Sequence, residues 1–233
     1  MHLVSMYTAA ALNASLPALN LFLPPGKALS DVFSHLTLMD LARLFARNAA
    51  RINHYYLLFL NLSALASAAP RCLGGAEPKL LRAEEFEELY ARLRSLESDD
   101  KRELMSRLLF YRSGFRNCYT IAADGATAFL EWIIFPAENE IIQKHYRTRF
   151  LPLESSEVML ENSFTFPAYR GRGLMPFATW QLLNKAKELG YRRAVTYIRK
   201  EKIDSLNHFL RMGFTIKRIV REIKLLGYTW RTL

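Results

Sequence analysis

Apolar runs typical of strands alternate with apolar positions at helical spacing along the C-terminal part of the chain. Residues 158–166 are rich in residues that favour strands, and residues 177–189 carry apolar side chains at near-helical spacing. Residues 191–199 alternate between polar and apolar positions as a half-buried strand does, and residues 205–211 form a short helical segment that ends before Gly213. This order of strand, helix, strand and helix predicts a fold that mixes α and β structure.

The same pattern extends towards the N-terminus. Residues 117–122 and 127–135 read as strands, and the Asp-Gly pair between them predicts a hairpin. Residues 83–96 and 99–111 read as amphipathic helices with acidic residues at their starts. Residues 138–149 read as a helix within an insertion that precedes the strand at 158. We therefore expect two helices, a hairpin and an insertion ahead of the last strands.

A glycine-rich turn joins the strand at 158–166 to the helix that follows it. The turn contains Gly171 and Gly173, and backbone N–H groups at such a helix start bind phosphate groups with help from the helix dipole. Its spacing matches neither GxxxxGK[ST] nor GxGxxG, so the common nucleotide-binding loops are excluded. The turn predicts a site for a phosphorylated ligand of another kind.

Two motifs resemble those of the GCN5-related N-acetyltransferase (GNAT) superfamily. The acyl-CoA loop of that superfamily reads Arg/Gln-x-x-Gly-x-Gly/Ala, and it is similar to the six residues 170–175 except at Met175. A second signature is similar to residues 202–205, followed by Phe209 and by Gly213-Phe214. The resemblance covers residues 115–225 and is to a bacterial subgroup with an N-terminal helical extension.

The resemblance implies a fold and an activity. It implies an α+β fold with a central, mostly antiparallel twisted sheet, a splayed strand pair at the CoA site, and flanking helices. It implies an acyl-CoA-dependent N-acyltransferase, most simply an N-acetyltransferase, that moves an acyl group directly from acetyl-CoA or another acyl-CoA to a primary amine of a small molecule. Three alternatives stay open: a long-chain acyl-CoA donor, an acyl carrier protein donor, and a non-catalytic module that binds acyl-CoA or nucleic acid.

The resemblance also implies which residues contact CoA. A backbone N–H within 164–166 would bond the thioester oxygen, the loop would hold the pyrophosphate, and the following short helix would complete the site; the expected CoA-binding residues are Phe164, Thr165, Phe166, Arg170, Gly171, Arg172, Gly173, Leu174, Met175, Lys202, Ser205 and Phe209. Lys202 stands where the family usually has Asn. Phe209 stands where many members have a tyrosine that protonates the leaving thiolate, so an acid at that position is excluded.

Acyl transfer to an amine also needs a group that takes up a proton. Glu157 and Glu161 lie four residues apart on the strand before the loop, so both face one side of the sheet. We expect Glu161 to be the base because it lies closer to the loop, with Glu157 as the alternative and Tyr197 as a further titratable candidate. A solvated or ion-paired role stays open for either glutamate.

The excess of positive charge lies in the segment that contains both motifs. Residues 170–233 contain 15 Lys and Arg against 4 Asp and Glu, whereas residues 1–169 contain 17 against 18. A positive field there would attract polyanionic CoA or an acidic carrier protein. The same charge suits nucleic acid, which we consider the weaker interpretation because no DNA- or RNA-binding motif accompanies it.

Residues 1–76 lie outside the resemblance. Residues 52–70 form an uncharged run of membrane-spanning length that polar residues interrupt. We expect a helical extension, residues 1–76, that packs on a catalytic domain of residues 77–233; peripheral membrane contact, or a channel for a long acyl chain, is the alternative. Cys72 and Cys118 are isolated, so neither a zinc site nor a disulfide is expected. A cytoplasmic monomer or homodimer is the resulting expectation.

Overall fold

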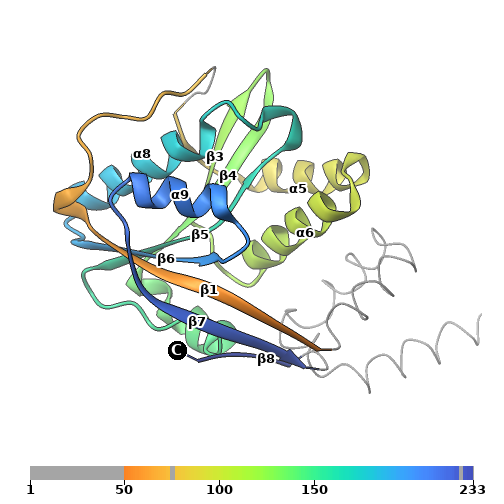
Figure 1. The fold of residues 1–233 in the computed structure, drawn as a ribbon. Coiled ribbons are helices and arrows are strands. Elements are labelled where there is room, and N and C mark those ends of the chain that lie inside the picture. Colours follow the sequence, from red (N-terminus) through yellow and green to blue (C-terminus); the bar gives the residue numbers. More distant parts are fainter. Residues whose placement is uncertain (1–49, 74–76, 226–227, 233) are drawn as a thin grey trace, which may run out of the picture.

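The computed structural model describes residues 50–73, 77–225 and 228–232 (Figure 1). Its strands and helices follow one another along the chain in this order: β1 Ala50–Asn61, β2 Lys79–Leu80, α5 Ala83–Arg92, α6 Ser98–Arg112, β3 Cys118–Ala123, β4 Ala126–Ile134, α7 Asn139–Ile141, β5 Glu157–Thr165, α8 Leu174–Glu188, β6 Arg193–Arg199, α9 Ile203–Arg211, β7 Thr215–Leu225 and β8 Tyr228–Arg231.

The described strands form one eight-stranded mixed sheet. Their order across the sheet is β2-β3-β4-β5-β6-β1-β7-β8. Every neighbouring pair is antiparallel except β5 and β6, which run parallel. The predicted mixed, mostly antiparallel sheet with flanking helices is therefore confirmed.

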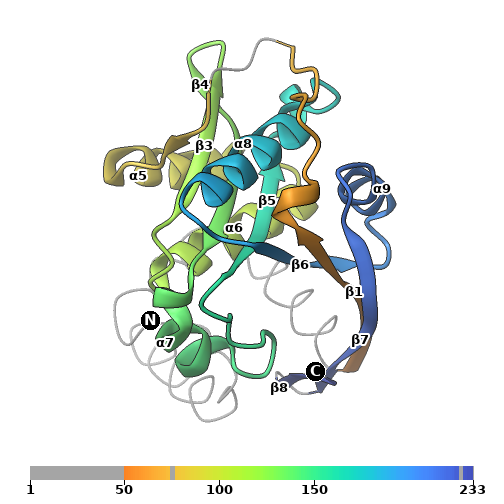
Figure 2. The ribbon, with the colours of Figure 1, turned by 90° about the vertical axis from the view of Figure 1, so that its left-hand side faces the viewer.

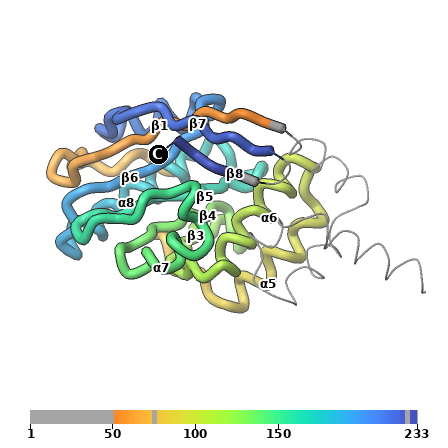
Figure 3. Tube along the Cα trace, turned by 90° about the horizontal axis from the view of Figure 1, so that it is seen from below, coloured from red at the N-terminus to blue at the C-terminus, as the bar shows by residue number. Residues whose placement is uncertain are grey.

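Helices cover the two faces of this sheet with separate apolar cores. On one face, Leu182 of α8 and Leu206 of α9 pack with the sheet residues Leu58, Leu160 and Ile198. On the other face, the core joins α5 and α6 to β3, β4 and β5. Figure 3 shows α5 and α6 beside the β3–β5 half of the molecule, with β1 and β7 on the opposite side. The face covered by α8 and α9 is called the α8 face, and the face covered by α5 and α6 is called the α6 face.

The hairpin between β3 and β4 is as predicted. Asp124 and Gly125 both have positive φ angles, 52° and 76°, as a two-residue turn of the type favoured in hairpins requires. The helices expected at 83–96, 99–111, 177–189 and 205–211 are present as α5, α6, α8 and α9. The insertion is helical up to Tyr146, as a 3₁₀ turn Pro136–Glu138, the short α7 and a π-helical turn Ile142–Tyr146. The helix expected over 138–149 is therefore present in most of that range, but not as a regular α-helix.

Strand β1 corrects the expected helical extension. Residues 50–61 form a strand between β6 and β7, paired with β6 from Tyr55–Arg199 to Asn61–Arg193. The expectation of a helix is thus wrong for this segment, while residues 1–49 lie outside the described residues. The cause is burial on both faces: Leu57 packs on the α6 face and Leu58 on the α8 face, so the strand lacks the alternation that reveals a half-buried one. Among the described residues, no helix is long and apolar enough to cross a membrane.

Replacing Leu58 with alanine tests whether β1 belongs to the core. Leu58 is 0% exposed, so we expect its loss to lower the free energy of unfolding by about 3 kcal/mol through lost burial and a cavity. Ile52 lies on the same strand but is 59% exposed, and Ile52→Ala should cost less than about 0.5 kcal/mol. Urea denaturation of both variants measures the difference. Equal costs would contradict the placement of β1.

Candidate functional site

The glycine-rich loop has the backbone geometry that its sequence predicts. It follows a 3₁₀ turn over Pro167–Tyr169 and leads into α8. Gly171 and Gly173 have φ angles of 78° and 77°, in the left-handed region that side chains disfavour. Gly173 is the N-cap residue of α8, and the first N–H groups of a helix have no partner within it. The loop therefore presents backbone donors and the positive end of a helix dipole to an anion.

The two glycines of the loop have different surroundings. A Cβ atom on Gly171 would meet no atom within 4 Å, so this position borders open space. A Cβ atom on Gly173 would collide with the backbone carbonyl oxygen of Arg71. The segment 71–73 is held against the loop because the Leu73 N–H donates to the Arg172 carbonyl oxygen at 2.9 Å. Gly173 is thus needed for chain packing, whereas Gly171 faces the side that a ligand can approach.

Both arginines of the loop are used to shape it. Arg170 forms an ion pair with Asp100 of α6, and its Nε donates to the Thr165 carbonyl oxygen at 3.3 Å. Arg172 forms an ion pair of 3.1 Å with Asp124 in the β3–β4 turn. Both guanidinium groups are therefore engaged within the protein, and the backbone N–H groups are the donors that the loop offers to an anion.

Strands β5 and β6 separate just before this loop. Their parallel pairing runs from Glu157–Arg193 to Leu160–Thr196 and ends there, although both strands continue (Figure 2). Beyond that point the Phe166 N–H donates to the Ala128 carbonyl oxygen of β4 at 3.0 Å. Because successive residues of a strand point their N–H groups to opposite sides, the Thr165 N–H points away from β4, towards β6. Of the three residues expected to polarise a thioester, Thr165 has the suitable direction.

A β-bulge marks the point of separation. Glu161 pairs with Trp132 of β4, but the next pair joins Phe164 to Leu130, so β5 contains one extra residue. Asn162 adopts a φ angle of 58°, which is uncommon for a residue other than glycine. The bulge keeps Phe164 and Phe166 in the core of the α6 face, where their rings lie 5.1 Å apart. The extra residue therefore turns the strand at Glu161.

The environment of Glu161 suits a proton acceptor. Its Oε1 is buried and has no hydrogen-bond partner. Burial raises the pKa of Glu161 to about 7, opposed by Arg231, by Arg107 and by the N–H groups of Asn162 and Tyr197, which favour the ionised form. A carboxyl with a pKa near 7 accepts and releases protons at neutral pH.

Glu157 and Tyr197 have structural contacts instead. Glu157 forms an ion pair with Arg193 and accepts the Glu154 N–H at 2.9 Å, at the end of β5 that is far from the loop. The Tyr197 hydroxyl accepts the Leu151 N–H at 3.4 Å, and burial raises the pKa of this tyrosine. Glu157 is thus held in an ion pair away from the point of strand separation, and Tyr197 accepts a backbone hydrogen bond from the insertion.

Helix α9 places its expected site residues in different surroundings. Lys202 Nζ lies 2.7 Å from Glu103 Oε1 of α6, so its charge is paired with a carboxylate rather than left for a phosphate. Phe209 is buried against Phe214, with ring centroids 5.0 Å apart, in the core of the α8 face. Ser205 is half-buried on the same helix. The structure thus does not gather these three residues at one point.

Leu174 and Met175 begin α8 as part of its packing. Leu174 is buried in the small core beside β3 and β4, and Met175 packs against that core and the larger core of the α8 face. The larger side chain of Met175, in place of the small residue of the motif, is accommodated by this contact. Their backbone N–H groups, rather than their side chains, face the helix N-terminus.

Two charged groups, the partly buried Arg107 and the buried Glu131, have no signal in the sequence. Arg107 of α6 reaches β5 and donates to the Ser163 carbonyl oxygen at 3.2 Å. Glu131 of β4 is buried under α8, where it accepts the Thr179 hydroxyl at 2.9 Å and burial raises its pKa to about 8. Each contact joins residues at least 48 positions apart, so no local motif could have indicated it.

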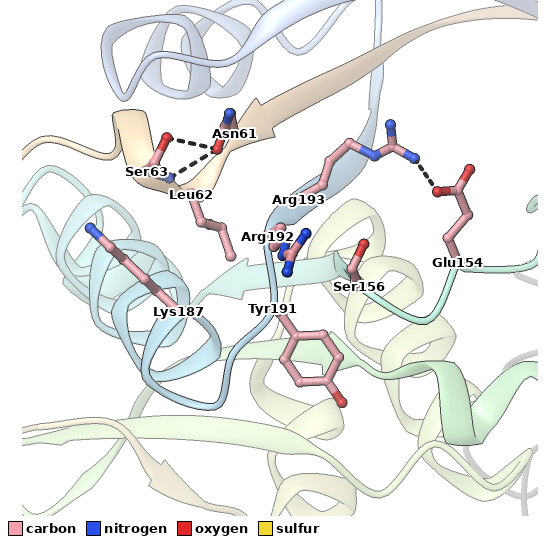
Figure 4. Close-up of a pocket in the computed structure, with 9 residues that line it drawn as sticks. All are labelled: Asn61, Leu62, Ser63, Glu154, Ser156, Lys187, Tyr191, Arg192 and Arg193. Carbon is pink, nitrogen blue, oxygen red and sulfur yellow. Dashed lines mark hydrogen bonds and ion pairs between the residues drawn. The ribbon is translucent and has the colours of Figure 1, made fainter.

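Two cavities lie outside the loop and the point of separation. The larger, about 460 Å³, lies where β5 and β6 begin, and Figure 4 shows the residues around it: Asn61, Leu62, Ser63, Glu154, Ser156, Lys187, Tyr191, Arg192 and Arg193. The smaller, about 230 Å³, lies on the α6 face and extends to Tyr197. Among the described residues, no group of His, Cys, Asp and Glu side chains is arranged to hold a metal ion.

Solved structures of other proteins share this fold. One is a tandem GNAT protein from the clavulanic acid biosynthesis pathway. The structural match covers 90% of this chain and 61% of that protein's chain, with a TM-score of 0.51 and 15% sequence identity. The GCN5-related glucosamine N-acetyltransferase region of a fungal multi-domain GH3 β-N-acetylglucosaminidase matches 78% and 22%, with a TM-score of 0.55 and 14% identity. A Drosophila protein matches 82% and 58%, with a TM-score of 0.52 and 15% identity.

The chain therefore has the GNAT fold. It spans less than two thirds of the length of each of these three proteins, and their sequence identity to it is low. No protein-family model matches the sequence, and no curated protein matches it. The fold is common to N-acetyltransferases, which gives the loop and the strand separation a chemical context.

Proposed function

We propose that this protein is an acyl-CoA-dependent N-acyltransferase that moves an acyl group directly from the thioester to a primary amine of a small molecule. The observation that carries the proposal is one continuous stretch of chain. Residues 161–174 contain in order the Glu161 carboxyl, whose pKa is near 7, the Thr165 N–H, which points towards β6, and the loop with its left-handed glycines. Acetyl-CoA is the donor we expect.

The loop and β5 account for donor binding. The pyrophosphate of CoA lies on the backbone N–H groups at the start of α8, where the helix dipole favours negative charge. The Thr165 N–H then donates to the thioester oxygen, on which negative charge develops during attack. A donor fixed in advance at that position stabilises the transition state without reorganisation.

Proton transfer follows from the side chains at the strand separation. The amine nitrogen attacks the thioester carbonyl carbon, a C–N bond forms, and the amine proton passes to the Glu161 carboxylate directly or through water. The C–S bond then breaks and CoA leaves as a thiolate. Phe209 has no proton to give, and the thiolate takes its proton from water.

Release of free thiol tests the activity. The protein is incubated with acetyl-CoA and with longer acyl-CoAs over a panel of primary amines, and free CoA is measured. We expect thiol release that requires both the amine and the protein. Tight CoA binding without turnover on any amine would instead assign the chain to the second candidate, a non-catalytic acyl-CoA-binding module, which the absence of an acid at Phe209 favours.

Gly171→Val tests the loop. The new side chain projects into the open space beside the loop, so we expect the dissociation constant of CoA to rise at least about tenfold, roughly 1.4 kcal/mol. Gly190→Val is the matched control, because Gly190 also has a positive φ angle, 89°, and open space around it, but lies at the other end of α8. Calorimetry measures binding. Equal affinities in the two variants would contradict the assignment of the loop.

Glu161→Gln tests the base. Only the ionised carboxylate accepts a proton, so we expect kcat/KM, corrected for ionisation of the amine, to rise with pH through about 7 and then level off. The glutamine variant should lose this rise and about 100-fold in rate, while CoA affinity stays constant. Glu131→Gln, which removes another buried carboxyl on the opposite face, should keep the rise. A rise that persists in Glu161→Gln would exclude Glu161 as the base.

A further inference from the structure

Two of the buried polar atoms without a hydrogen-bond partner belong to side chains at β5, close to the point where β5 and β6 separate. They are Oε1 of Glu161 and Nε of Arg107. Arg107 lies beside β5 because its Nη2 donates to the Ser163 carbonyl oxygen, two residues beyond Glu161. A buried polar atom without a partner is costly, and native proteins satisfy such atoms with protein, water or ligand.

The charge of Arg107 is only partly matched within the protein. Its nearest carboxylate oxygen is Glu103 Oε2 at 3.6 Å, and Glu103 also binds Lys202 at 2.7 Å. Glu161 also attracts Arg107 when it is ionised, and Glu222 is paired with Arg231 at 2.9 Å. Two cations therefore share the carboxylate of Glu103, which leaves positive charge available beside Glu161.

A cavity lies on the same face of the sheet as Glu161, beside the paired part of β5 and β6. The 230 Å³ cavity has a mostly apolar lining, which includes Met159, Val195, Leu57 and Tyr197. Its charged lining residues, Glu154, Glu157 and Arg193, are ion-paired with one another. Met159 precedes Glu161 by two residues on β5, and side chains two apart on a strand lie about 6.8 Å from each other on one face. Met159 thus joins the cavity to the strand face that carries Glu161, and the cavity is large enough for an aliphatic or aromatic group.

We propose that the acceptor is an α-amino acid with an apolar side chain. Its amino group lies at Glu161, its carboxylate binds the Arg107 guanidinium, and its side chain enters the cavity beside Met159. This assignment rests on the proposed acyltransferase function and specifies its acceptor. The reaction forms one C–N bond and breaks one C–S bond, which yields an N-acyl amino acid and free CoA, with the amine proton taken by Glu161.

Matched acceptors test the assignment on the unmodified protein. Leucine is compared with leucinamide and 3-methylbutylamine, which lack the carboxylate, and with glycine, which lacks the side chain; acetyl-CoA is the donor. We expect kcat/KM, corrected for the unprotonated fraction of each amine, to be at least about tenfold higher for leucine than for each of the others. Equal or faster turnover of the two amines that lack the carboxylate would overturn the assignment and leave the acyltransferase function intact.

Binding is measured separately from turnover, so that the two failures can be told apart. Calorimetric titration of leucine and of leucinamide into the protein saturated with CoA should show binding for leucine that is at least about tenfold tighter. Absence of leucine binding overturns the assignment whatever the turnover shows. Absence of turnover on every amine, with CoA bound, overturns the proposed function itself.

Two arginine variants on one helix locate the carboxylate site. Arg107→Gln should lower the preference for leucine over leucinamide at least about tenfold, mainly through KM for leucine, and Arg107→Lys should restore part of it. Arg102→Gln is the control, because Arg102 also lies on α6 but pairs with Asp99 at 3.1 Å on the exposed side. An unchanged preference in folded Arg107→Gln would overturn the role of Arg107. If that variant unfolds on heating at a much lower temperature, the acceptor panel on the unmodified protein still decides.

Discussion

The separation of β5 from β6 is the constraint on which the candidate site depends. A strand that leaves its neighbour exposes unpaired backbone groups, and it stays in place only if its other edge is held. Strand β6 keeps its pairing with β1 through Tyr197 and Arg199, beyond the point where β5 has left. Strand β1, outside the segment that contains the motifs, thus supports the open side of the site.

Charges buried around the separation explain why Glu161 differs from Glu157. Both carboxyls lie on one strand, four residues apart, yet Glu157 has Arg193 as a direct partner and Glu161 has an unpaired oxygen. Burial raises the pKa of Glu161, whereas a direct ion pair holds Glu157 in a structural role. The same strand therefore supplies one stabilising carboxylate and one that can exchange protons near neutral pH.

Local sequence predicted the elements whose cause is local. The left-handed glycines, the Asp-Gly hairpin and the helix that starts after Gly173 depend on residues within a few positions of one another. Strand β1 could not be predicted in this way, because a strand buried on both faces has an uncharged apolar run that resembles a buried or membrane helix. Lys202 and Phe209 matched positions of a motif, but an ion pair with Glu103 and packing on Phe214 decide what they contact.

The sequence by itself determined the loop, the order of most strands and helices, and the choice of Glu161 as the first candidate for the base. Only the tertiary structure decided that residues 50–61 complete the sheet, that Thr165 directs its N–H towards β6, and that Arg107 lies beside Ser163. The physical reason is distance along the chain. Turn and helix signals arise from neighbouring residues, whereas strand pairing and the burial of charge depend on residues that only folding brings together.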